Sequence, residues 1–207
     1  MIAISKAPDR RRAALGVRAH SGWAAAILLA GPADAPQILD RRRIALCDPA
    51  IEGSKQPFHH AEPMDFADAE SFIAECARSS EKHARKALDQ LIALAKAHRC
   101  RIGGCGIVAA SGRVLPDLRS ILASHALIHA AEGEFYRGAF ARACERETIA
   151  VSRVREREIE SWTASRVGEK NLKTAIVAMG KALGPPWTAD EKLSTMIAWL
   201  ALASMTG

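Results

Sequence analysis

The sequence predicts a single α/β domain whose five-stranded mixed sheet carries helices on both faces. Two observations predict this class. The first part of the chain holds three strand-like apolar segments with short connections, whereas the rest alternates helical periodicity with two further strand-like segments. Consecutive strands joined by short turns form an antiparallel meander, and strands separated by helices form parallel neighbours.

The composition is that of an ordinary globular domain. The chain has 207 residues, 49% hydrophobic and 25% charged, which is sufficient for a core without covalent cross-links. The longest apolar run, residues 23–31, is too short to span a bilayer, and the basic N-terminus lacks the apolar segment of a secretory signal. We therefore expect a cytoplasmic protein without membrane contact, with a flexible tail over residues 1–12 and one domain over residues 13–207.

Charge and cysteine usage restrict the function only loosely. The net charge of +6 permits an anionic partner such as nucleic acid, but aromatic residues for base stacking make up only 5% of the chain. The five cysteines are an odd number and are scattered through apolar patterns, so we expect reduced thiols rather than disulfides or a zinc knuckle.

Three strands are expected first, at residues 13–17, 23–30 and 37–46, because these segments are apolar and are separated by Gly-containing turns. The next segment, 48–66, contains three prolines and a glycine, and we expect a loop there. Loops this long are uncommon in compact domains and are often functional.

Helices alternate with strands in the remaining chain. Helical spacing of apolar residues predicts a long helix over 68–98 and a second helical region from Pro116 to about Cys144. Residues 101–110 form a Gly-rich buried strand between them, and residues 148–154 form the fifth strand.

Two helices close the chain. The first covers residues 169–183 and ends at the Gly-Pro-Pro sequence that follows. Thr188 is expected to cap the second, over residues 189–204, with Asp190 and Glu191 in its first turn.

The second helical region carries an unusual polar face. His125, His129 and Glu132 stand at i, i+4 and i+7, so their side chains project from one side of a helix. Histidine at such a position binds metal or transfers protons near neutral pH. The alternative is a solvated helix surface, with His129 bonded to a backbone carbonyl.

Several stretches together resemble a known family. Residues 15–17 (Leu-Gly-Val) and 21–24 (Ser-Gly-Trp-Ala) form a strand–turn–strand pattern, residues 130–134 lie in a helix that precedes a strand, and residues 167–170 (Val-Gly-Glu-Lys) precede Trp187 and an Ala/Leu-rich helix. Over most of the chain this succession resembles the RuvC-type Holliday-junction resolvases of the ribonuclease H-like superfamily. The resemblance implies strand order 3-2-1-4-5, with strand 2 antiparallel.

The resemblance also implies four carboxylates that hold two divalent metals for phosphodiester cleavage. Arg18 occupies the position of the first-strand aspartate, residues 108–111 hold no acid, and Leu193 stands where the closing helix would carry its second carboxylate. Asp190 is the one acid that matches. Because hard divalent cations need several oxygen ligands, we do not expect two-metal nuclease chemistry.

Topology predicts where other functional side chains meet. The C-terminal ends of strands 1, 3, 4 and 5 share one edge, which is where ligands bind in open α/β sheets. Candidate catalytic residues there are His20, His125, Glu132 and Asp190. Candidate ligand-binding residues are Arg18, Ser21, Ser111, Arg113, Ser124, Arg153 and Arg155. Candidate ligands for one divalent metal ion are His59, His60, Glu62 and His129.

Arg153, Arg155 and Arg157 alternate with glutamates, and an extended chain would place the three arginines on one side. We interpret this segment as a solvated edge whose charges compensate one another rather than as a nucleic-acid surface.

Three functions remain open from the sequence. The first is a nucleic-acid-binding or scaffolding protein of resolvase type that lacks two-metal chemistry. The second is a hydrolase in which His20, His59 or His60, and His125 converge on one centre, with or without a metal. The third is a homodimer formed through an apolar stripe of the closing helix, made of Met196, Ile197, Trp199 and Leu200.

Overall fold

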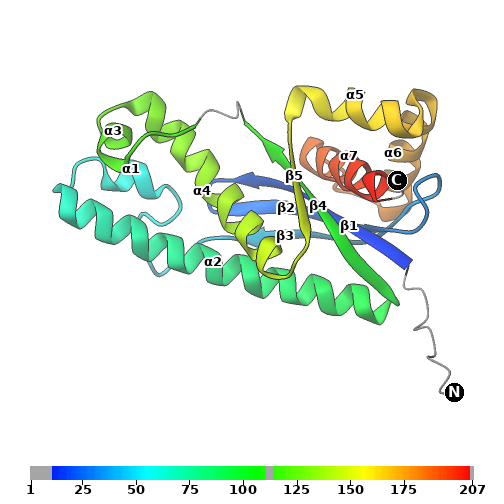
Figure 1. The fold of residues 1–207 in the computed structure, drawn as a ribbon, viewed down its shortest axis with the longest axis horizontal. Helices are drawn as coiled ribbons and strands as arrows, with labels where there is room; N and C mark the ends of the chain where they lie inside the picture. Colours follow the sequence, from blue (N-terminus) through cyan, green and yellow to red (C-terminus); the bar gives the residue numbers. More distant parts are fainter. Residues whose placement is uncertain (1–10, 111–113, 206–207) are drawn as a thin grey trace, which may run out of the picture.

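A computed structural model describes residues 11–110 and 114–205 of the chain and shows one mixed sheet in the order β3-β2-β1-β4-β5 (Figure 1). Strand β2 is antiparallel to β1 and β3, whereas β4 is parallel to β1 and β5 is parallel to β4. The predicted order and directions are therefore confirmed. The strands are β1 (Arg11–His20), β2 (Trp23–Ala30), β3 (Gln37–Ala45), β4 (Cys100–Ala109) and β5 (Ala150–Arg155).

Helices cover both faces of the sheet, as predicted (Figure 1). Helices α2 and α4 pack on one face, and α7 packs on the other face with α5 and α6 beside it. The helices are α1 (Pro57–Ala61), α2 (Phe66–Ala97), α3 (Leu118–Leu122), α4 (His125–Arg146), α5 (Glu156–Val167), α6 (Glu169–Leu183) and α7 (Ala189–Ser204).

Strand β1 lies at the centre of the sheet, and its alternating side chains supply both cores. Ala13, Leu15 and Val17 are buried against α2 and α4, whereas Ala14 is buried on the opposite face with α7. Gly16 shares the α7 face. A Cβ atom at this position would lie 1.8 Å from the backbone oxygen of Ser194, so only glycine allows α7 to approach β1 this closely.

The part of the chain that precedes β5 differs from prediction in three places. Strand β1 begins at Arg11, so Arg11 and Arg12 pair with β4 instead of belonging to a tail; the rest of the predicted tail lies outside the described residues. The expected loop over 48–66 contains helix α1. The predicted helical region after Pro116 is divided into α3 and α4.

The C-terminal part contains a helix that was not predicted. The chain leaves β5 at Arg155 and enters α5 at Glu156, so the expected extended alternation of Arg153, Arg155 and Arg157 is wrong. Within α5 only Ile159 and Thr163 are buried, which is too few for a clear helical stripe in the sequence.

The closing helix is confirmed in detail. Thr188 forms a capping box with Glu191, and α7 covers β1, β2 and β4. Ile197, Trp199 and Leu200 are buried in the chain's own core, so this stripe is not free to form a homodimer. All five cysteines are free thiols, as expected. None of the helices described combines the length and the apolar character that a membrane span requires.

Candidate functional sites

An arginine and two carboxylates meet where β1 ends. Because Gly16, Arg18 and His20 alternate along one face of β1, the Arg18 side chain extends toward the first turns of α5 and α7. Its Nη1 lies 2.7 Å from Oδ1 of Asp190, and its Nη2 donates to Oε2 of Glu156 at 3.0 Å. The guanidinium therefore pairs with two acids from different helices. We call these three residues the arginine cluster.

His20 borders the arginine cluster. Its ring stacks on Trp23 with the centroids 4.3 Å apart, and the guanidinium of Arg43 lies 3.7 Å from the centroid of the Trp23 ring. Nε2 of His20 is 3.1 Å from Oδ2 of Asp190, but the approach does not have the geometry of a hydrogen bond. This contact is an electrostatic one, available when the imidazole is protonated.

A shallow cavity opens beside this stack. It measures about 370 Å³ and is lined by Ser21, Gly22, Trp23, Arg43, Ala45, Cys47 and Lys55. Two of these side chains, Arg43 and Lys55, are exposed cations. The rim of the cavity is therefore positively charged.

Three histidines form a second cluster, which we call the histidine cluster. His125 and His129 stand one turn apart on α4, and His59 comes from α1, which packs against α4 (Figure 1). One ring nitrogen from each residue lies within 4.8 Å of the others, and the two Nε2 atoms of His125 and His129 are 3.0 Å apart. His59 is half-buried, whereas the other two are exposed. This arrangement places three nitrogen ligands around one point.

Glu132 connects α4 to α1 and contacts His59 of the histidine cluster. Its Oε1 accepts the backbone N–H groups of Phe58 at 2.8 Å and His59 at 3.1 Å, and lies 3.2 Å from Nδ1 of His59. Gln56, the N-cap residue of α1, makes no side-chain capping bond, so Glu132 takes over that role. Glu132 is 4% exposed, and this burial raises the pKa of its carboxyl, although the bonds from α1 oppose the shift.

The sequence therefore predicted most of the members of the two clusters but expected one site. The structure brings Arg18, His20 and Asp190 together, and separately it brings His59, His125 and His129 together beside Glu132. The expected convergence of His20 with the other histidines is not found among the described residues.

Other predicted site residues lie outside both clusters. His60 packs on Phe72, and Glu62 is exposed at the end of α1, so neither joins the histidine cluster. Arg153 pairs with Glu134, which also pairs with Arg137. Arg155 lies 3.7 Å from Glu158. Ser124 is the N-cap residue of α4, but its side chain makes no capping hydrogen bond. Ser111 and Arg113 lie outside the described residues.

Glu156 is the member of the arginine cluster that sequence reasoning missed. The alternation of charges predicts extended chain at Glu156, where its side chain would have no fixed relation to β1. The signal that identifies it is the pair of acids Glu156 and Glu158 after Arg155, because acids are enriched in the first turn of a helix.

Comparison with known proteins supports the fold. No protein-family profile matches the chain, and no curated protein matches it by sequence. Among solved structures, Thermus thermophilus RuvC has a TM-score of 0.53 at 9% identity, covering 94% of this chain and 95% of that one. A second similar structure is T. thermophilus RuvC in complex with Holliday junction substrate, with a TM-score of 0.54 at 11% identity, covering 95% and 96%. The chain thus has a RuvC-like, ribonuclease H-like fold.

Proposed function

We propose that this protein binds nucleic acid on a ribonuclease H-like frame and does not cleave it by two-metal chemistry. The observation that carries the proposal is the pairing of Arg18 with Asp190 and Glu156 at the end of β1. The resemblance to resolvases assigns metal-binding carboxylates to this part of the sheet, and here a guanidinium stands between the acids.

The charges explain why metal binding is disfavoured there. Mg²⁺ requires several oxygen ligands in octahedral geometry, and one oxygen of each carboxylate in the arginine cluster is already paired with the Arg18 guanidinium. An ion bound to the same oxygens would stand a few ångströms from the guanidinium. At about 4 Å, each unit of positive charge on the ion costs about 4 kcal/mol at an effective dielectric constant of about 20.

Nucleic-acid binding is supported by charge and by similarity. The chain carries a net charge of +6, and the cavity beside the arginine cluster presents Arg43 and Lys55 at its rim. One of the similar structures is bound to a Holliday junction. Cations at a concave rim contact phosphates without reading sequence, so we expect binding that depends on the shape and charge of the nucleic acid.

The test is a titration of a four-way DNA junction and a matching duplex between 50 and 200 mM salt. We expect the logarithm of affinity to fall linearly with the logarithm of salt concentration, with a slope of about −0.9 for each phosphate contacted. The double variant Arg43→Ala, Lys55→Ala should bind more weakly and with a shallower slope, by about 2. No cleavage is expected in Mg²⁺ or Mn²⁺.

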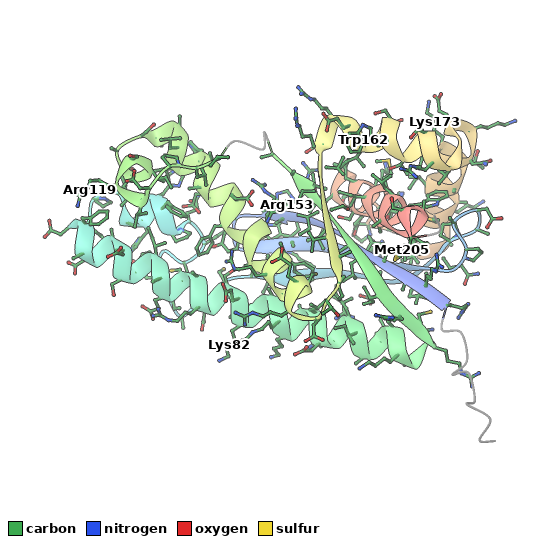
Figure 2. All side chains as sticks on the ribbon, in the orientation of Figure 1. Lys82, Arg119, Arg153, Trp162, Lys173 and Met205 are labelled. Carbon is green, nitrogen blue, oxygen red and sulfur yellow. The ribbon has the colours of Figure 1, made fainter. Side chains whose placement is uncertain are left out.

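Lys82→Ala is the matched control, because Lys82 is exposed on the outer side of α2, away from the cavity (Figure 2). It should leave the slope unchanged if binding occurs at the cavity. An affinity that does not change with salt concentration would overturn the proposal that the protein binds nucleic acid. Metal-dependent cleavage by the purified protein would overturn the proposal that it lacks two-metal chemistry.

A second candidate, a hydrolase with a histidine-based centre, is favoured by the histidine cluster. That hypothesis requires His20, His59 or His60, and His125 to converge. His59 and His125 meet the requirement, with ring centroids 5.5 Å apart, but His20 does not, because it lies beside Asp190. The centre would therefore work without His20. Hydrolysis of a simple phosphate ester that disappears in His125→Ala would support this candidate, and equal background rates in both proteins would eliminate it.

A further inference from the structure

We propose that His59, His125 and His129 bind one divalent metal ion of the zinc class, with Glu132 as the carboxylate that orients His59. The inference depends on the geometry of the three histidines and on the buried carboxylate of Glu132. It therefore stands or falls independently of nucleic-acid binding and of hydrolysis.

The first argument is the distance between the ring nitrogens. Zn²⁺ binds imidazole nitrogen at about 2.0–2.1 Å, which places two ligands of a tetrahedral site roughly 3.3 Å apart. The Nε2 atoms of His125 and His129 are already 3.0 Å apart. Two neutral imidazoles tolerate this contact only if one donates a proton to the other, and two protonated rings repel. A metal ion between the nitrogens removes both constraints.

The second argument is the position of the third histidine. His59 reaches the same point from α1, with its ring centroid 4.7 Å from that of His129. If Nδ1 of His59 donates to Glu132, Nε2 is the nitrogen left to bind an ion. Imidazole ligands suit Zn²⁺ and similar borderline ions, whereas Mg²⁺ and Ca²⁺ require oxygen.

The third argument is Glu132, which is an independent observation. Metal-binding histidines usually donate their other ring N–H to a carboxylate or carbonyl, which fixes the tautomer and strengthens the ligand. Glu132 makes this contact from a buried position, and its Oε2 has no hydrogen-bond partner among the described residues. An ionised carboxylate is costly to bury without a compensating charge, and a metal ion on the far side of His59 supplies one.

The number of protein ligands determines whether the proposed metal site is open or closed. No fourth histidine, cysteine or acid in the described part of the chain joins the group, and His125 and His129 are exposed. Three protein ligands leave one coordination position for water or an anion, as in sites with exchangeable ligands rather than closed structural sites. The ion would join α1 to the first turns of α4.

The experiment is a titration of the untagged, chelator-treated protein with Zn²⁺ against a competing chromophoric chelator, repeated with Co²⁺. We expect one ion per chain and, for Co²⁺, the intense visible absorption of a four-coordinate site. The double variant His125→Ala, His129→Ala should bind at least 100-fold more weakly. Glu132→Gln should bind about 10- to 100-fold more weakly, because the amide still accepts from α1 but carries no charge.

His98→Ala is the matched control, since His98 is an exposed histidine at the end of α2, outside the cluster. It should bind like the unmodified protein. Circular dichroism verifies folding of the double variant, whose substituted side chains are both exposed, and His129→Gln provides a milder variant with one ligand fewer. Equal affinity of the unmodified protein and both ligand variants would overturn the site, as would Co²⁺ bound without that spectrum. Unchanged affinity in Glu132→Gln would overturn the role of Glu132.

Discussion

The arginine cluster and the histidine cluster belong to helices on opposite faces of the sheet and differ in the charge that their side chains present. In the first, two carboxylates from α5 and α7 already have a cation, the guanidinium of Arg18. In the second, three imidazoles bring ring nitrogens close together, and the buried carboxylate of Glu132 contacts one of the imidazoles, that of His59. We therefore expect the first cluster to disfavour a metal ion, and we propose that the second cluster binds one.

The two clusters also differ in what holds them together. The arginine cluster depends on the close approach of α7 to β1, which Gly16 permits. The histidine cluster depends on hydrogen bonds that backbone N–H groups in the first turn of α1 donate to Glu132. Changes at these supports should affect one cluster and leave the other intact.

The largest effect is expected for Gly16→Ala. The added Cβ would meet the Ser194 oxygen at 1.8 Å, so α7 must move away from β1, at a cost of about 3 kcal/mol or more in the free energy of unfolding. Urea denaturation measures the loss. Gly104→Ala is the control, because a Cβ there makes only ordinary contacts at 3.7 Å. Equal stability of the two variants would contradict the close packing of α7 on β1.

Arg18→Asp tests whether the guanidinium is what excludes metal from the arginine cluster. The substitution removes the cation and brings a third carboxylate beside Asp190 and Glu156, so we expect this variant to bind Mn²⁺ about tenfold or more tightly at this cluster than the unmodified protein does. Electron paramagnetic resonance counts the bound ion. Adding Asp190→Asn should reverse the gain. No gain in the single variant would show that Arg18 is not the reason for exclusion.

The smallest effect is a pH dependence at Glu132. Burial raises the pKa of this carboxyl in the folded chain above its ordinary value of 4.5, which applies to the unfolded chain. At a pH between the unfolded and the folded pKa, the folded chain therefore binds more protons than the unfolded chain. Its contribution to stability is therefore greatest below pH 4.5 and declines as pH rises toward the native pKa. Glu132→Gln should remove this decline in metal-free protein. Parallel stability–pH curves for the two proteins would contradict the raised pKa.

Local signals in the sequence were sufficient for most of the architecture. Continuous apolar runs separated by Gly and Pro predicted the strands, and Thr188 with Glu191 predicted the start of α7, because a cap and its helix are neighbours in the chain. The elements that escaped prediction lack such signals. Helix α1 has five residues, and its first N–H groups are satisfied by Glu132, which lies more than seventy positions away.

Each candidate site likewise contains some residues that local sequence patterns identified and others that only tertiary packing brought in. The sequence established that His125, His129 and Glu132 share one helix face, because helical periodicity requires it, and it assigned Arg18 and Asp190 to one edge. Only the tertiary structure selected His59 rather than His60 or His20 as the third histidine, and introduced Glu156 as the second partner of Arg18. Those choices depend on how α1 packs on α4 and how α5 follows β5. Contacts between segments so distant in the chain are decided by packing, which leaves no periodic trace in either segment.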